Sequence, residues 1–149
     1  MGSLTIPANG LVYVDAQAVI YSVEKHPIYS PLLRPLWAAV KPGTLEVATS
    51  ELTILECLVG PLKLGNVSVV VAFEQFFQLP GIRLLPITAA ILRDAARLRA
   101  DIGKLKTPDA IHAATAIQNR CVQLVTNDAA FRAIGSVPVI MLNDLIAKP

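Results

Sequence analysis

Short apolar runs alternate along the chain with longer stretches in which apolar residues recur every three or four positions. Short apolar runs are typical of buried strands, and the helical period is typical of helices that pack on one side. The runs predict strands at 11–14, 45–48, 82–87, 122–126 and 137–141. The other stretches predict helices at 16–24, 27–40, 50–59, 66–78, 89–102 and 107–119.

Several helix ends are marked by residues that prefer such places. Thr88 and Thr107 are expected to cap the helices that follow them, and Pro108 suits a first turn, where no backbone N–H is needed. The Gly-Pro pair at 60–61 and the Pro-Gly pair at 80–81 are expected to stop the preceding helices.

Strands separated by helices predict an α/β fold in which helices cover both faces of a parallel sheet. The nearly continuous apolar strands agree, because strands of such sheets are buried on both faces. The chain has 149 residues and contains no repeat, low-complexity tract or linker. We therefore expect a single domain over 1–149, with its core at about 10–145.

Composition narrows the possible functions. The net charge is only +2, so any affinity for nucleic acid must come from a local basic patch. Cys57 and Cys121 have neither CxxC spacing nor a nearby His, which predicts buried free thiols rather than a zinc site.

Export and membrane anchoring are not expected. The first ten residues lack a basic region followed by an apolar stretch. No charge-free apolar run reaches the roughly 18 residues that a membrane span needs. We expect a soluble, cytoplasmic protein with no membrane partner.

Acidic residues occur where the predicted fold would bring them together. Asp15 and Asp128 directly follow predicted strands, and ligands of parallel sheets bind beyond the carboxyl ends of the strands. Asp109 lies in a first helical turn and shares a helix face with Ala113 and Ala116, whose small side chains allow close approach to the sheet.

Glu56 completes this set. It borders the apolar stripe predicted for its helix, which consists of Leu52, Leu55 and Val59, and so should point toward the margin of the core. Carboxylate oxygens are the ligands that Mg²⁺ prefers, and Mg²⁺ neutralises charge at phosphates. The four acids therefore predict a site for a divalent cation.

The chain resembles PIN-domain proteins of the VapC type, which are the ribonuclease toxins of bacterial and archaeal toxin–antitoxin pairs. The resemblance is carried by VYVDAQAVIYSVE, TSELTILECL, TPDAIHAATA and LVTNDAAF. The four acids of the family match Asp15, Glu56, Asp109 and Asp128, and Ser50 and Thr53 match the pattern that precedes the glutamate.

The resemblance implies a three-layer sandwich with a five-stranded parallel sheet, and a Mg²⁺- or Mn²⁺-dependent endoribonuclease. It also implies an RNA substrate, a homodimer and an antitoxin partner. Asp15 and Asp109 are the first choice for direct metal ligands. Glu56 and Asp128 are expected to act through water, hold a second ion or orient the nucleophile.

One departure from the family pattern follows the first acid. Ala16 and Gln17 stand where the family commonly has Ser or Thr and then Asn or Ser. Gln17 can still donate a hydrogen bond to a metal-bound water or a phosphate. A catalytically weak or inactive PIN-like module that binds RNA or protein is the alternative function.

Other side chains are candidates for substrate contact. Arg93, Arg97 and Lys104 form a basic segment that could bind phosphates or merely face solvent. Asn127 could position a water or cap a turn. His112 could shuttle protons, although a hydrogen-bonded or exposed helix histidine is the simpler interpretation.

Two phosphate-handling classes of similar architecture fit less well. Receiver-like domains need paired acids before the strand-end Asp and a later strand-end Lys, and neither is evident. Haloacid-dehalogenase-like phosphatases need a second Asp two residues after the first, where this chain has Gln17.

Overall fold

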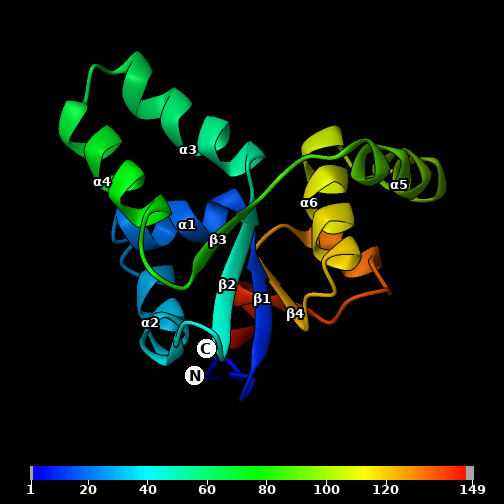
Figure 1. Ribbon diagram of the computed structural model, residues 1–149, viewed down its shortest axis with the longest axis horizontal. Helices are drawn as coiled ribbons and strands as arrows, with labels where there is room; N and C mark the ends of the chain where they lie inside the picture. Colours follow the sequence, from blue (N-terminus) through cyan, green and yellow to red (C-terminus); the bar gives the residue numbers. More distant parts are fainter. Residues whose placement is uncertain (1, 147–149) are drawn as a thin grey trace.

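The structure is a computed structural model that describes residues 2–146. Its centre is one five-stranded sheet with the order β3-β2-β1-β4-β5, in which every neighbouring pair is parallel (Figure 1). The strands are β1 (Gly10–Val14), β2 (Leu45–Ser50), β3 (Ile82–Leu85), β4 (Gln123–Thr126) and β5 (Val139–Met141).

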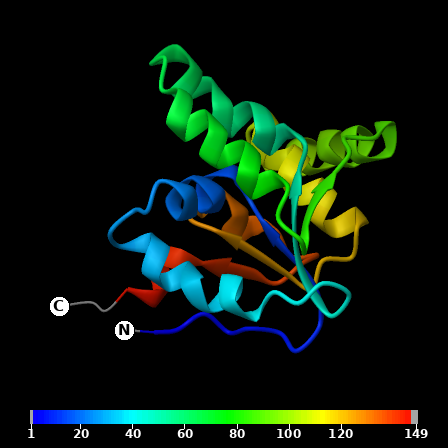
Figure 2. The ribbon, with the colours of Figure 1, turned by 60° about the vertical axis from the view of Figure 1, so that its left-hand side comes forward.

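Helices cover both faces of this sheet. They are α1 (Ala16–Val23), α2 (Tyr29–Ala39), α3 (Leu52–Lys63), α4 (Val67–Phe77), α5 (Ala89–Asp101) and α6 (Thr107–Gln118), with short 3₁₀ helices η1 (Ala129–Ala133) and η2 (Leu142–Leu145). Figures 1 and 2 show α1–α4 on one side of the sheet and α5 and α6 on the other. The predicted α/β three-layer sandwich is confirmed.

The central strand shows why the fold has two cores. Side chains alternate between the faces of a strand. Val12 and Val14 pack in the core beneath α1, α2 and α4, whereas Tyr13 packs in the core beneath α5 and α6. All three are fully buried, which explains the uninterrupted apolar run in the sequence.

The predicted end of α3 was wrong. The helix continues through Gly60 and Pro61 to Lys63, with Leu64 as its C-cap. Gly65 follows the cap, and its φ of 65° lies in the left-handed region. The N–H of Gly65 bonds to the carbonyl of Leu62 and that of Asn66 to the carbonyl of Pro61, which is the Schellman arrangement that closes many helices. The ring of Pro61 is buried, so packing offsets the lost backbone bond.

The predicted buried stripe of α3 was also wrong. Leu55 and Val59 are exposed, and the buried residues are Thr53, Cys57 and Pro61. The hydroxyl of Thr53 is hydrogen-bonded to that of Thr49, so a polar residue can face the core at this point. Leu55, Val59 and Leu62 are thereby left on the surface.

The cap of α6 differs slightly from its prediction. Lys106 occupies the capping position, and Thr107 is the first helical residue. The hydroxyl of Thr107 instead accepts a hydrogen bond of 2.7 Å from Arg99, which joins the end of α5 to the start of α6. The predicted cap of α5 is confirmed, because Thr88 accepts from the backbone N–H of Ile91.

Both cysteines are buried and free, as predicted. Burial raises the pKa of Cys57 and Cys121 to about 12, so neither thiol is a nucleophile at neutral pH. Within residues 2–146, no helix combines the length and apolarity needed to cross a membrane.

A carboxylate pocket at the carboxyl edge of the sheet

A polar pocket of about 550 Å³ opens at the carboxyl ends of the central strands. The elements on its two sides, α3 and α6, lie on either side of this end of the sheet in Figure 1. The pocket is lined by all four predicted acids and by both predicted amides, together with His112 and apolar neighbours. The acids are Asp15, Glu56, Asp109 and Asp128, and the amides are Gln17 and Asn127.

Asp15 connects the sheet to the pocket. It caps α1 through a 3.1 Å hydrogen bond from the N–H of Ala18 to Oδ1, and Oδ2 accepts a 2.5 Å bond from the hydroxyl of Thr126. Only 5% of the residue is exposed. This burial raises the pKa of the Asp15 carboxyl above its ordinary 3.8, although the Thr126 hydrogen bond opposes the shift.

Thr126 holds the ends of two neighbouring strands together. Besides donating to Asp15, its hydroxyl accepts a 3.1 Å bond from the N–H of Asp128. Asp128 then begins η1 by accepting from Ala130 through Oδ1. Sequence reasoning missed Thr126, and its signal was a hydroxyl residue in a buried strand position directly before the last acid.

Asp109 stands in the first turn of α6, where the helix dipole favours an acid. Burial raises the pKa of its carboxyl, and the nearby charge of Asp128 raises it further. The charge of Asp15 also raises the pKa of Asp109, by a smaller amount. The charge of Glu56 in turn raises the pKa of Asp15. The four carboxylates therefore repel one another, and a cation among them would relieve this repulsion.

Glu56 is fixed by a hydrogen-bonded chain that begins in the sheet. Its Oε1 lies 2.6 Å from Nε2 of His112, and Nδ1 of His112 lies 2.5 Å from the hydroxyl of Tyr13. That hydroxyl accepts a 3.1 Å bond from the N–H of Ser50. His112 is thus hydrogen-bonded on both sides. Sequence reasoning missed Tyr13, whose buried hydroxyl required a partner.

The two amides differ in their surroundings. Gln17 is exposed at the rim of the pocket. Asn127 accepts a 2.9 Å bond from the N–H of Asn143 and donates to the hydroxyl of Tyr21, so it ties η2 to the site.

The predicted basic residues do not line the pocket. Arg93 and Lys104 are exposed on and after α5, and Arg97 forms an exposed 2.8 Å ion pair with Asp94. They lie on the same side of the sheet as α6, which carries Asp109 (Figure 1).

The donor set suits a hard cation that keeps part of its water shell. In the described part of the chain, no three His, Cys, Asp or Glu side chains are close enough to enclose a metal ion by themselves. Mg²⁺ is usually bound by one or two carboxylates and several waters, and it does not require an all-protein cage. The pocket therefore fits a partly hydrated cation such as Mg²⁺ or Mn²⁺ better than it fits a structural metal ion that is enclosed by protein ligands alone.

Comparison with known families decides the classification. The family model for the PIN domain matches residues 12–137, a range that includes all four acids. The chain belongs to the PIN domain family. Among curated proteins, none matches it.

Solved structures share the fold of this PIN domain. VapBC2 from Rickettsia felis matches with a TM-score of 0.69 at 18% identity, covering 88% of this chain and 98% of that chain. A toxin–antitoxin complex from Klebsiella pneumoniae matches with a TM-score of 0.64 at 23% identity, covering 88% and 97%. VapC20 from Mycobacterium tuberculosis, a toxin that cleaves the sarcin-ricin loop, matches with a TM-score of 0.68 at 20% identity, covering 83% and 95%.

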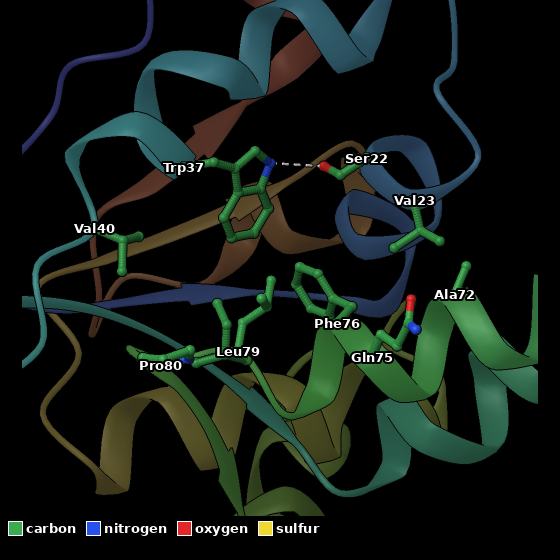
Figure 3. A pocket seen from close by; sticks show the side chains of 10 residues that line it. Ser22, Val23, Trp37, Val40, Ala72, Gln75, Phe76, Leu79 and Pro80 are labelled. Atoms are coloured by element: carbon green, nitrogen blue, oxygen red, sulfur yellow. Dashed lines mark hydrogen bonds between the residues drawn. The ribbon is translucent and has the colours of Figure 1, made fainter.

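A second pocket of the PIN domain lies between α1, α2 and α4 and has a volume of about 530 Å³ (Figure 3). Its wall is mostly apolar, with Trp37 edge-on to Phe76 and donating a 2.9 Å hydrogen bond to Ser22. None of its lining residues is titratable. In this respect it differs from the carboxylate pocket, which is lined by five Asp, Glu and His side chains.

Proposed function

We propose that this PIN domain is a Mg²⁺- or Mn²⁺-dependent endoribonuclease that hydrolyses RNA phosphodiesters at the carboxylate pocket. The observation that carries the proposal is the convergence of Asp15, Glu56, Asp109 and Asp128 in one pocket at the carboxyl edge of a PIN-type sheet. These four side chains come from segments far apart in the sequence, so folding is needed to assemble them.

The proposed roles follow from the contacts of each acid. Asp15 and Asp109 would hold the cation directly. Burial disfavours the ionised form of both carboxyls, and a nearby positive charge would stabilise that form. Glu56 and Asp128 would act through water, hold a second ion or orient the attacking water. The bound cation would polarise a phosphoryl oxygen and lower the pKa of a water. Thr126 keeps Asp15 in place for this task.

Cleavage of RNA is the direct test. Purified protein incubated with structured RNA that contains single-stranded loops should cut it in Mg²⁺ or Mn²⁺ and leave it intact in EDTA. Equal cleavage in EDTA would contradict a metal-dependent site. Binding of RNA without cleavage under any metal condition would favour the PIN-like binding module instead.

The toxin role and its antitoxin partner are proposed from the structural neighbours. The Rickettsia felis and Klebsiella pneumoniae structures are toxin–antitoxin complexes. An equimolar amount of the cognate antitoxin should abolish RNA cleavage by this protein. Undiminished cleavage in a complex that demonstrably forms would contradict an inhibitory partner.

We further propose that the protein is a homodimer through α3. Leu55, Val59 and Leu62 are exposed by 64%, 44% and 62%, and they border a groove of about 700 Å³. Glu51 precedes α3 and Lys63 ends it. Antiparallel pairing of two α3 helices about a two-fold axis would cover the apolar stripe and set each Glu51 beside a Lys63 of the other copy.

Two lysines in this stripe should break the dimer. A charge buried without a partner costs about 3–5 kcal/mol, so Leu55→Lys with Leu62→Lys should weaken self-association by roughly 10²–10³-fold or more. Analytical ultracentrifugation should show a dimer for the wild type and a monomer for this variant. Ile28→Lys, at another exposed apolar position, should stay dimeric. A variant that remains dimeric would place the interface elsewhere.

The basic segment should contribute affinity for RNA rather than chemistry. Changing Arg93, Arg97 and Lys104 together to Ala should weaken binding and flatten its salt dependence. Each lost phosphate contact lowers the slope of log affinity against log salt by about 0.7 for single strands. Turnover at saturating RNA should change little, because none of the three lines the pocket.

A matched triple variant controls for net charge in this experiment. Lys25, Arg34 and Lys41 are also exposed, and α2 and its flanking loops lie on the opposite side of the sheet. Changing these three to Ala should leave the salt slope unchanged. Equal slopes for both triple variants and the wild type would show that the 93–104 segment only faces solvent.

A further inference from the structure

The hydrogen-bonded chain from Tyr13 to Glu56 spans three elements of the fold. Tyr13 belongs to β1, His112 to α6 and Glu56 to α3. His112 is 2% exposed, and its two ring nitrogens bond to Tyr13 and Glu56. This series of hydrogen bonds therefore links the buried sheet to Glu56, whose side chain lines the pocket and is 27% exposed.

The direction of each hydrogen bond follows from the chemistry of the partners. A carboxylate offers only acceptor atoms, so the 2.6 Å contact with Oε1 of Glu56 requires a proton on Nε2 of His112. At the other end, the hydroxyl of Tyr13 already accepts from the N–H of Ser50. Burial raises the pKa of this phenol well above 10.0, so it keeps its own proton.

The phenol can therefore donate to Nδ1 of His112. With Nδ1 as an acceptor and Nε2 as a donor, every contact in the chain pairs one donor with one acceptor. The opposite tautomer would set a bare Nε2 against a carboxylate oxygen, which is repulsive. This is how ring tautomers are fixed in general: the partner of one ring nitrogen decides whether the other nitrogen carries the proton.

We propose that His112 is a positioning residue, held by Tyr13 at Nδ1 so that its Nε2–H points to Glu56, that clamps Oε1 of Glu56 and leaves Oε2 directed to the pocket. The expected effect of this clamp on cation binding rests on the proposed function, in which Glu56 contributes to the cation site. A free Glu side chain samples several rotamers, and holding it by a charge-assisted hydrogen bond removes that freedom before the cation binds.

The tautomer is tested in the metal-free protein. ¹⁵N NMR of the imidazole should show a protonated Nε2 and an unprotonated Nδ1 for His112. Tyr13→Phe removes the donor to Nδ1 and should shift the spectrum toward a mixture of tautomers. A wild-type spectrum with the proton on Nδ1, or on both nitrogens, would overturn the proposal.

The consequence for the cation is tested by calorimetric titration with Mn²⁺. Outer partners of metal ligands typically contribute 10–100-fold to affinity, so His112→Leu should weaken Mn²⁺ binding by about that factor. His112→Gln retains a side-chain N–H donor and should recover most of the loss. His26→Gln, at a half-buried histidine that does not line the pocket, should bind Mn²⁺ like the wild type.

The outcomes separate the two claims. Equal weakening in His112→Leu and His112→Gln would overturn the role of the Nε2–H donor. No Mn²⁺ binding by the wild type would contradict the proposed function, while the NMR result would still decide the clamp on Glu56. Should His112→Leu fail to fold, the comparison of the His112 tautomer in the wild type and in Tyr13→Phe by NMR decides the proposal.

Discussion

Asp15→Asn is expected to abolish RNA cleavage while leaving the fold intact. Asn keeps an Oδ1 that can accept from the N–H of Ala18, so the cap of α1 survives. The hydroxyl of Thr126 can reverse and accept from the new amide, because it has two lone pairs. What disappears is the negative charge that would hold the cation. Losing several kcal/mol of charge stabilisation should lower the rate by roughly 10³-fold or more.

Asp109→Asn should cause a similar loss, and the control is an identical change outside the pocket. Asp94→Asn breaks only the exposed pair with Arg97, so its cleavage rate should match that of the wild type. Rates are compared by gel analysis of a labelled RNA with Mn²⁺ present. Near-normal cleavage by either pocket variant would remove that carboxylate from the catalytic set.

The second large effect concerns stability, and its sign follows from the raised pKa of Asp15 and Asp109. A carboxyl whose pKa is higher in the folded than in the unfolded chain stabilises the fold below the ordinary pKa of 3.8. This contribution is lost as the pH rises through the folded pKa. At neutral pH the charged carboxylates therefore cost stability, so Asp15→Asn should be at least as stable as the wild type without metal.

A bound cation should reverse this order. At a hundred times its dissociation constant, a ligand adds about 2.7 kcal/mol to the free energy of unfolding. For a domain of this size, that amounts to a rise in Tm of roughly 5–10 °C. Mn²⁺ should produce this rise in the wild type and almost none in Asp15→Asn.

Thermal and urea unfolding at neutral pH, with and without Mn²⁺, provide the measurement. A metal-free Asp15→Asn that loses more than about 2 kcal/mol would show that the carboxylate mainly holds α1 and β4 together. An equal rise in Tm for both proteins would place the cation outside the pocket.

Local pattern was sufficient for much of the fold and for the placement of the acids. The strand and helix periods predicted the layers. The position of Asp15 and Asp128 directly after predicted strands was enough to predict that they lie at the carboxyl edge of the sheet. The cap of α5 at Thr88 was also readable, because a capping bond joins residues only three positions apart.

Contacts between distant elements were not readable from local pattern. Which face of α3 is buried depends on α1 and β2, and the hydrogen bond between Thr49 and Thr53 allowed a polar face to turn inward. The bond from Tyr13 to His112 joins residues 99 positions apart, so no local period contains it. The stop at Gly65 was missed because Pro61 was treated as a breaker without regard to its packing.

The departure from the family pattern at Ala16 and Gln17 now has a structural setting. Ala16 is buried, so it packs where the family commonly has a hydroxyl residue, whereas Gln17 stays exposed at the rim of the pocket. A loss of substrate contact at Ala16 would leave the four carboxylates unchanged. Under the proposed function, the departure would affect positioning of the phosphate more than retention of the cation.

The most direct test of a metal-dependent carboxylate nuclease is the initial rate of RNA cleavage as a function of Mn²⁺ concentration, for the wild type and Asp15→Asn purified side by side. We predict a rate that rises and saturates for the wild type, falls to background in EDTA and returns when Mn²⁺ is restored. The variant should stay at background throughout. Identical curves for the two proteins, or cleavage by the wild type that EDTA does not affect, would contradict the assignment of the reaction to this pocket.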